Sequence, residues 1–239
     1  MSGHSKWNNI KRKKEKTDAA RAKIFTKIGK EMAVAIRAGG PNPASNSKLR
    51  ELIAKAKANN VPNDNIERAI KKFRDSDVIY EEITYEGYGP AGVAVIVETA
   101  TDSRNRTVGN VRHYFDKCGG NIGVQGCVGF MFSDMGLITI EDEDGDIDEE
   151  KLMETALEAG AADFESDEGV YEITTECDDL EAVADAIRAA GYTVLTAEKT
   201  KIPSSYVSLS DEDAEKMEKM LDYLDEDEDV TAVYHNWEA

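Results

Sequence analysis

Cysteine and long apolar runs are scarce in this chain. Its three cysteines, Cys118, Cys127 and Cys177, are too few and too scattered for a disulfide framework, and they predict a reducing compartment. Residues 91–97 give only seven small or apolar residues in a row, whereas a membrane-spanning helix needs about 20. The basic N-terminal segment lacks the apolar stretch of a secretory signal. The sequence therefore predicts a cytoplasmic protein with no membrane partner.

Side chains arranged for catalysis or metal binding are also few. The chain has three histidines, and His113, Cys118 and Cys127 lack the spacing that lets two thiolates bind one metal ion. It contains neither a nucleophile-elbow serine motif nor a phosphate-binding loop of the Walker type. We therefore predict a protein that is not an enzyme and that takes no metal, cofactor or small-molecule substrate. The alternative is a phosphoryl-processing enzyme that uses its many carboxylates with a divalent ion.

Two segments resemble ligand-binding loops only in part. Residues 87–92 fit the glycine pattern of a dinucleotide site, but an apolar strand follows where a helix is needed, and Pro90 has no N–H for a phosphate. We interpret this segment as a hairpin turn. The acidic residues 142–148 resemble a calcium loop, but Ile147 stands where that loop needs glycine and Met153 where it needs glutamate. This segment is predicted to be a solvated acidic turn.

Charges of opposite sign are concentrated in different parts of the chain. Residues 1–74 hold 19 Lys and Arg against 6 Asp and Glu, a net charge of +13. The other 165 residues hold 10 against 42, a net charge of −32. Such a separation predicts that the N-terminal part binds a polyanion, either DNA or ribosomal RNA, and that the rest of the chain would be repelled by it.

The basic part is predicted to be an arm followed by a helical bundle. Residues 2–14 are polar and basic without an apolar period, whereas apolar residues recur at helical spacing in three segments of residues 18–74. The second and third helices could also form a helix-turn-helix pair that presents the third to a major groove, although any three-helix bundle contains such a pair. The side chains presented would be Asn65, Arg68, Lys71 and Lys72.

From residue 78 the pattern changes to strands alternating with helices. Residues 79–100 predict a hairpin and residues 103–117 a helix, with a further strand at 128–132. Residues 137–200 follow the βαββαβ order of a ferredoxin-like unit. A strand near residues 206–209, an acidic helix at 211–224 and a strand at 230–234 are expected to complete the earlier sheet. The predicted fold class is therefore α+β with three domains: residues 1–77 (basic arm and three-helix bundle), residues 78–134 with 204–239 (a discontinuous α+β domain), and residues 135–203 (an inserted ferredoxin-like domain).

Six ordered motifs resemble one known family. They begin with Gly-His-Ser-Lys-Trp-Asn-Asn-Ile at residues 3–10, which runs into the basic residues 11–14. The others lie at residues 38–41, 60–63, 85–90, 119–123 and 233–236. Together they strongly resemble the YebC family, which includes the mitochondrial translational activator of cytochrome oxidase subunit one. Cys127 departs from the pattern, because a small residue such as serine is expected there.

The resemblance implies a cytoplasmic protein with a helical N-terminal domain and two α+β domains. Members of this family are commonly described as DNA-binding transcriptional regulators. A second description is a ribosome-associated translation factor that relieves stalling at difficult sequences such as proline runs. The charge partition favours RNA modestly, because a basic arm can enter a ribosomal RNA cleft while the acidic domains stay away from the phosphates.

The predicted nucleic-acid contacts are basic side chains of the arm and first helix, together with Trp7, whose ring could stack on a base. A second basic cluster, on the helix of residues 103–117, could extend this surface, although ion pairs with neighbouring carboxylates explain it equally well. The full predicted set is His4, Lys6, Trp7, Lys11, Arg12, Lys13, Lys14, Lys16, Arg21, Lys23, Lys27, Arg104 and Arg106.

Overall fold

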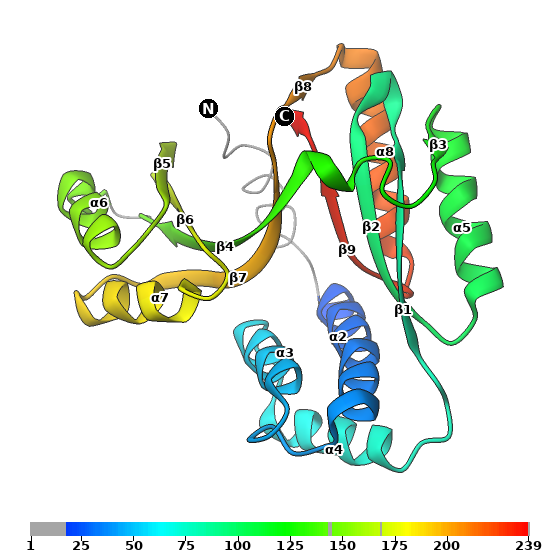
Figure 1. Ribbon diagram of the computed structural model, residues 1–239, viewed down its shortest axis with the longest axis horizontal. Coiled ribbons are helices and arrows are strands. Elements are labelled where there is room, and N and C mark those ends of the chain that lie inside the picture. Colours follow the sequence, from blue (N-terminus) through cyan, green and yellow to red (C-terminus); the bar gives the residue numbers. More distant parts are fainter. Residues whose placement is uncertain (1–17, 143–144, 168, 239) are drawn as a thin grey trace. The chain divides into compact units, whose positions relative to one another are not determined.

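The computed structural model describes residues 18–142, 145–167 and 169–238, and of residues 18–22 only the backbone. Two compact units are present in these residues. One is formed by residues 131–206, and the other joins the chain up to Phe130 with residues 207–237. Both units can be followed in Figure 1.

The larger unit begins with three helices, α2 (Asp18–Gly39), α3 (Ser47–Ala58) and α4 (Asn63–Arg74). Their apolar stripes cover one another in a core of Ile28, Met32, Leu49, Leu52 and Ile66. Buried Asn46 joins α2 to α3, because its amide donates to the carbonyl oxygens of Ala35 and Gly40, both at 2.8 Å, while its oxygen caps α3. The predicted helical part is thus present in the described residues.

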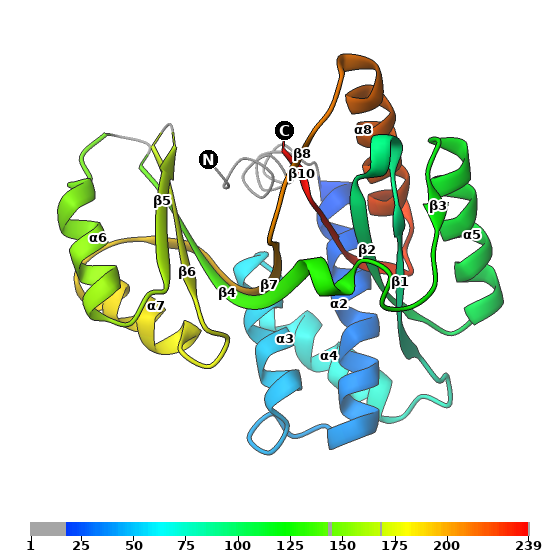
Figure 2. The ribbon, with the colours of Figure 1, turned by 45° about the horizontal axis from the view of Figure 1, so that its top comes forward.

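The same unit contains an antiparallel sheet with the strand order β3-β1-β2-β9. The strands are β1 (Glu81–Tyr88), β2 (Ala94–Thr101), β3 (Asn121–Ile122) and β9 (Val230–His235). Helices α5 (Arg104–Lys117) and α8 (Asp211–Glu226) run along one face, as Figures 1 and 2 show. Val95, Val97, Phe115, Met217 and Leu224 form the core between them. Helix α2 contacts β2 and β9, so the helical part and this sheet belong to one unit.

The smaller unit has the predicted ferredoxin-like order. Its elements are β4 (Phe132–Glu141), α6 (Glu149–Glu158), β5 (Asp163–Asp167), β6 (Val170–Thr175), α7 (Leu180–Ala189) and β7 (Val194–Pro203). The antiparallel sheet runs β5-β6-β4-β7, and Ile138, Ile140, Leu152, Ile173 and Ile187 form its core with the two helices. The α+β fold class is confirmed, whereas the domain boundaries given above stay predictions.

The structure corrects the sequence-based assignment at two places. The strand expected at residues 128–132 is a 3₁₀ turn, η2 (Gly129–Met131), and only Phe132 enters a strand. The reason is that the N–H groups of Val128 and Gly129 bind the Glu86 carboxylate and therefore cannot join a strand ladder. In the late segment β9 pairs with β2 as expected, but β8 (Val207–Ser208) pairs with β10 (Trp237–Glu238).

The turn predicted at residues 87–92 is confirmed, since the 3₁₀ turn η1 (Pro90–Gly92) joins the antiparallel strands β1 and β2. At the acidic segment, the Asp142 carboxylate accepts N–H groups of Gly145, Asp146 and Ile147 at 2.9–3.1 Å, which is the geometry of a turn. Among the described residues, no helix is both long and apolar enough to cross a membrane.

Candidate nucleic-acid interface

Exposed basic side chains gather on α3 and α4. On α4, Arg68, Lys71 and Lys72 lie four, seven and eight residues after Asp64, so they share the face opposite to buried Ile66. The last turns of α3 and α4 carry further cations, which the helix dipole favours there. The exposed basic residues of the described helical part are Lys23, Arg37, Lys48, Arg50, Lys57, Arg68, Lys71, Lys72 and Arg74.

These side chains differ in how far they are already engaged. Within the described residues the amines of Lys48, Lys57 and Lys71 make no hydrogen bond or close ion pair, although the charge of Lys71 contributes to lowering the pKa of Asp75. The Lys72 amine lies 5.5 Å from the centre of the Phe73 ring. By contrast, Arg74 pairs with Asp75 at 2.7 Å, an interaction that raises the pKa of the guanidinium and lowers that of the carboxyl. The lysines are therefore the cations most available to a phosphate.

Three residues of the predicted set, Arg21, Lys23 and Lys27, occupy α2. Lys23 is exposed, as a phosphate contact requires. Lys27 is buried and donates to the carbonyl oxygen of Asp225 at 2.6 Å, with the Asp225 carboxylate 3.7 Å away. A phosphate could reach the Lys27 amine only if this contact with the C-terminal turn of α8 opened. Arg21 lies in α2, but its side chain is outside the described part of the structure. The other members of the predicted set lie wholly outside the described residues: His4, Lys6, Trp7, Lys11, Arg12, Lys13, Lys14 and Lys16.

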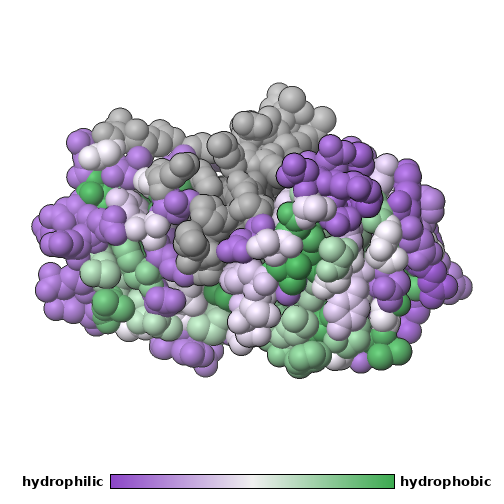
Figure 3. All heavy atoms as spheres, turned by 90° about the horizontal axis from the view of Figure 1, so that it is seen from above, coloured by the Kyte–Doolittle hydropathy of each residue, from purple (hydrophilic) through white to green (hydrophobic). Residues whose placement is uncertain are grey.

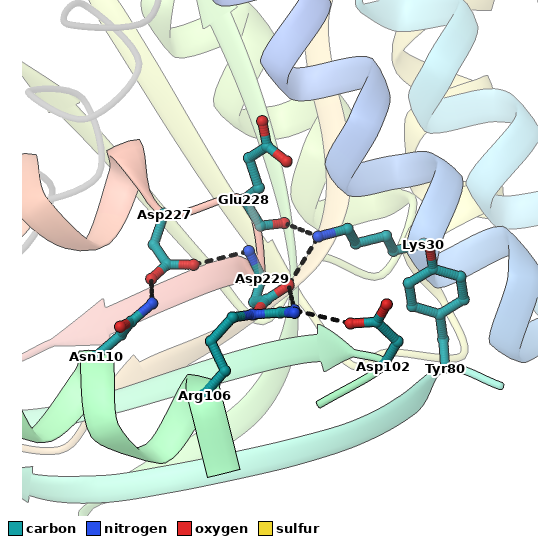
Figure 4. A pocket seen from close by; sticks show the side chains of 8 residues that line it. All are labelled: Lys30, Tyr80, Asp102, Arg106, Asn110, Asp227, Glu228 and Asp229. Atoms are coloured by element: carbon teal, nitrogen blue, oxygen red, sulfur yellow. Dashed lines mark hydrogen bonds and ion pairs between the residues drawn. The ribbon is translucent and has the colours of Figure 1, made fainter. Parts of the chain in front are cut away.

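A cluster of charges centred on Asp229 joins α2, α5 and the start of β9 (Figure 4). The Asp229 carboxylate lies 2.7 Å from the Lys30 amine and accepts three hydrogen bonds of 2.7–3.1 Å from Arg106. Thr107 donates to the same carboxylate at 2.9 Å. Arg106 also binds Asp102 at 2.8 Å. We call these five residues the Asp229 cluster.

Contacts within the Asp229 cluster shift the pKa values of Asp229 and Arg106. Burial raises the pKa of Asp229, but the hydrogen bonds from Lys30, Arg106 and Thr107 together outweigh it, so this pKa lies below its ordinary value. Hydrogen bonds with Asp229 and Asp102 raise the pKa of the Arg106 guanidinium. Both shifts favour the charged forms of Asp229 and Arg106, and the cluster is a paired, partly buried network.

The cluster borders a pocket of about 470 Å³, lined by Lys30, Tyr80, Asp102, Arg106, Asn110, Asp227, Glu228 and Asp229. Its four carboxylates outnumber its two cations, so it repels phosphate. The Asp227 carboxylate accepts hydrogen bonds from Asn110 and from the Tyr114 hydroxyl, each at 3.0 Å. Burial and the neighbouring Asp227 raise the pKa of Tyr114 to about 12. In the described residues, no group of three or more Cys, His, Asp or Glu is placed to hold a metal ion.

The second predicted basic cluster takes part in ion pairs. Arg104 pairs with Glu81 at 2.8 Å, and Arg106 belongs to the Asp229 cluster. The ion pairs considered as the alternative explanation for these two arginines are therefore present. Their contact with nucleic acid stays a prediction, and for Arg106 it competes with a buried carboxylate.

The Asp229 cluster could not be found by inspecting the sequence. Lys30 lies outside the apolar stripe of α2, as an ordinary surface lysine would. Its partner Asp229 lies 199 residues away in the chain. No local spacing links them, since the contact depends on the pairing of β9 with β2.

Family models match nearly the whole chain. The TACO1/YebC protein N-terminal domain matches residues 5–76, and the TACO1/YebC second and third domain matches residues 80–237. The chain belongs to the TACO1/YebC family. A relative from Hathewaya histolytica, named a probable transcriptional regulatory protein, is 57% identical over 240 residues, covering 100% of this chain and 97% of its own. A relative from Agathobacter rectalis, also named a probable transcriptional regulatory protein, is 56% identical over 241 residues, and the match covers 100% of both chains.

A solved structure shares the fold of this family member. The crystal structure of a conserved hypothetical protein, Aq1575 from Aquifex aeolicus, superposes with a TM-score of 0.82 at 43% sequence identity. The match covers 93% of this chain and 92% of the other. The family resemblance stated from the six motifs is thus confirmed.

Proposed function

We propose that this protein is a non-enzymatic regulator of gene expression that binds nucleic acid through its basic N-terminal part. The observation that carries the proposal is the partition of charge, +13 in residues 1–74 against −32 in the remainder. The names of the relatives from Hathewaya histolytica and Agathobacter rectalis, probable transcriptional regulatory proteins, agree with it.

The exposed lysines of α3 and α4 supply the described part of the proposed surface. Among residues 18–142, 145–167 and 169–238, no carboxylate lies within ion-pair distance of the amines of Lys48, Lys57 and Lys71, so a phosphate would not have to displace one there. Lysine amines bind phosphates as point charges without base preference. We therefore expect affinity that depends strongly on salt and only weakly on sequence.

A second candidate is a ribosome-associated translation factor that relieves stalling at sequences such as proline runs. The net charge of −32 beyond residue 74 favours it, because a protein that lies along duplex DNA brings its whole body near a dense row of phosphates. In ribosomal RNA, only the basic part would need to enter a cleft. Crosslinking in cells, followed by sequencing of both the bound DNA and the bound RNA, separates the two candidates by which of them is enriched.

The surface on α4 is tested by replacing Lys71 and Lys72 together with glutamine in the full-length protein. Glutamine keeps the helix propensity and removes two charges. If both lysines neutralise phosphates, the slope of log K against log salt should flatten by about 1.8 for a duplex or about 1.4 for a single strand. Fluorescence anisotropy with labelled duplex DNA and single-stranded RNA at several salt concentrations measures this slope.

Lys151→Gln is the matched control, because Lys151 is exposed on the acidic helix α6. It should leave both affinity and slope unchanged. Equal binding by the Lys71→Gln/Lys72→Gln protein and the wild type would remove α4 from the interface. Absence of binding by the wild type at low salt would refute the proposed function itself.

A further inference from the structure

Two apolar side chains project from one loop of the larger unit. Val124 is 77% exposed and Phe130 is 80% exposed. Among the described residues, these are the two most exposed large apolar side chains. On the face of the molecule drawn in Figure 3, hydrophobic and hydrophilic residues both reach the surface. Exposure of the phenyl ring forgoes about 1.5–3 kcal/mol of the burial that normally stabilises it.

The loop that carries them, residues 123–130, is held rigidly by β1. The buried Glu86 carboxylate accepts hydrogen bonds from the N–H groups of Gly126, Val128 and Gly129 at 2.7–2.9 Å. The Tyr88 hydroxyl donates to the carbonyl oxygen of Cys127 at 3.2 Å. Gly126 adopts a φ of 85°, which side chains disfavour. The exposed side chains therefore project from a preformed loop and need little ordering when they bind.

The charge around this loop is unusual for the molecule. Residues 117–133 contain no Asp or Glu, the longest such stretch after residue 74, in a region that holds 42 acidic residues. The Glu86 carboxylate, which accepts the N–H groups of the loop, is buried. At the edge of the stretch the Lys117 amine lies over the Tyr223 ring, 4.2 Å from its centre. This is a neutral to weakly basic surface to which a polyanion can come close.

We propose that the loop of residues 123–130 is a second nucleic-acid contact, at which an unpaired base of a single strand stacks on the Phe130 ring. Val124 then supplies an apolar contact to the same strand. Stacking on an exposed aromatic ring suits every base, because each has a π face, and it needs the base to be free of its duplex. The inference rests on the proposed function and adds to it a preference for single strands. A protein partner would not require a surface without carboxylates.

Phe130→Ala in the full-length protein tests the proposal with a labelled single-stranded RNA and a duplex of the same length. The Kd for the single strand should rise about 5- to 150-fold, the loss expected for one stacked base, while the Kd for the duplex changes less than about twofold. The salt slope should be unchanged, because no charge is removed. Phe130→Trp should retain the affinity. Leu157→Ala, which truncates another exposed apolar side chain on α6, is the control and should bind as the wild type does.

A spectroscopic readout is independent of affinity. In a Trp7→Phe background, Phe130→Trp adds one tryptophan to buried Trp237, and its emission should be quenched by the single strand but not by the duplex. Wild-type binding of the single strand by Phe130→Ala, with no quenching at position 130, would overturn the proposal. The proposed function would still stand if the Lys71→Gln/Lys72→Gln protein had lost affinity in the same assay. If the Phe130→Ala protein lost binding to a protein partner but still bound the single strand as the wild type does, the proposed role of the loop would also be overturned.

Discussion

Replacing Asp229 with asparagine should destabilise the larger unit by about 3 kcal/mol. The Asp229 side chain is 4% exposed and its partner Lys30 is 12% exposed, so neither charge can be fully hydrated when the other is lost. Removing one partner of a buried pair costs about 3–5 kcal/mol. We expect the lower end of this range, because the Arg106 side chain is 48% exposed and Lys30 still donates to the carbonyl oxygen of Glu228 at 2.9 Å.

Urea unfolding followed by tryptophan fluorescence measures this loss. In a Trp7→Phe background Trp237 is the remaining tryptophan, and it lies in the core of the unit that contains Asp229. Asp134→Asn is the control, because the Asp134 carboxylate pairs with Lys201 on the surface of the other unit and is 72% exposed. Exposed pairs contribute about 0–1 kcal/mol. A loss below about 1 kcal/mol for Asp229→Asn would refute the reasoning that the cluster is buried and tightly paired.

Two further predictions concern the carboxylates of Asp229 and Glu86. Because the pKa of Asp229 is lowered in the folded protein, its stabilising effect should be complete above about pH 4 and should disappear as the pH falls through the native pKa. The difference in unfolding free energy between wild type and Asp229→Asn should therefore shrink below about pH 4, and a constant difference down to pH 2 would contradict this. Glu86→Gln should place an NH₂ group against loop N–H donors, which costs about 1–3 kcal/mol, and should speed hydrogen exchange at Gly126, Val128 and Gly129. Unchanged exchange at these amides, measured by NMR, would show that the carboxylate does not hold the loop.

Elements whose formation depends on local spacing could be predicted from the sequence. The apolar period of α4 and the βαββαβ order of residues 132–203 are both present in the structure. The 3₁₀ turn at Gly129–Met131 could not be predicted, because its apolar residues resemble a strand and its N–H groups bind a glutamate about 40 residues earlier. For the same reason, no local pattern in the sequence indicates that the amines of Lys27 and Lys30 bind groups of residues 225–229.

The contacts made by residues 225–229 change how the basic charge of the N-terminal part should be counted. A net charge of +13 treats every lysine as available, yet Lys27 and Lys30 are held by Asp225 and Asp229. A phosphate that took the Lys30 amine would remove one of the two cations that the buried Asp229 carboxylate holds, and one that took the Lys27 amine would displace its contacts with Asp225. Exposed lysines such as Lys71 carry no such cost. Under the proposed function, we therefore expect the phosphate surface of the described residues to lie on α3, α4 and the exposed Lys23 and Arg37, whereas Lys27 and Lys30 fasten α2 to residues 225–229.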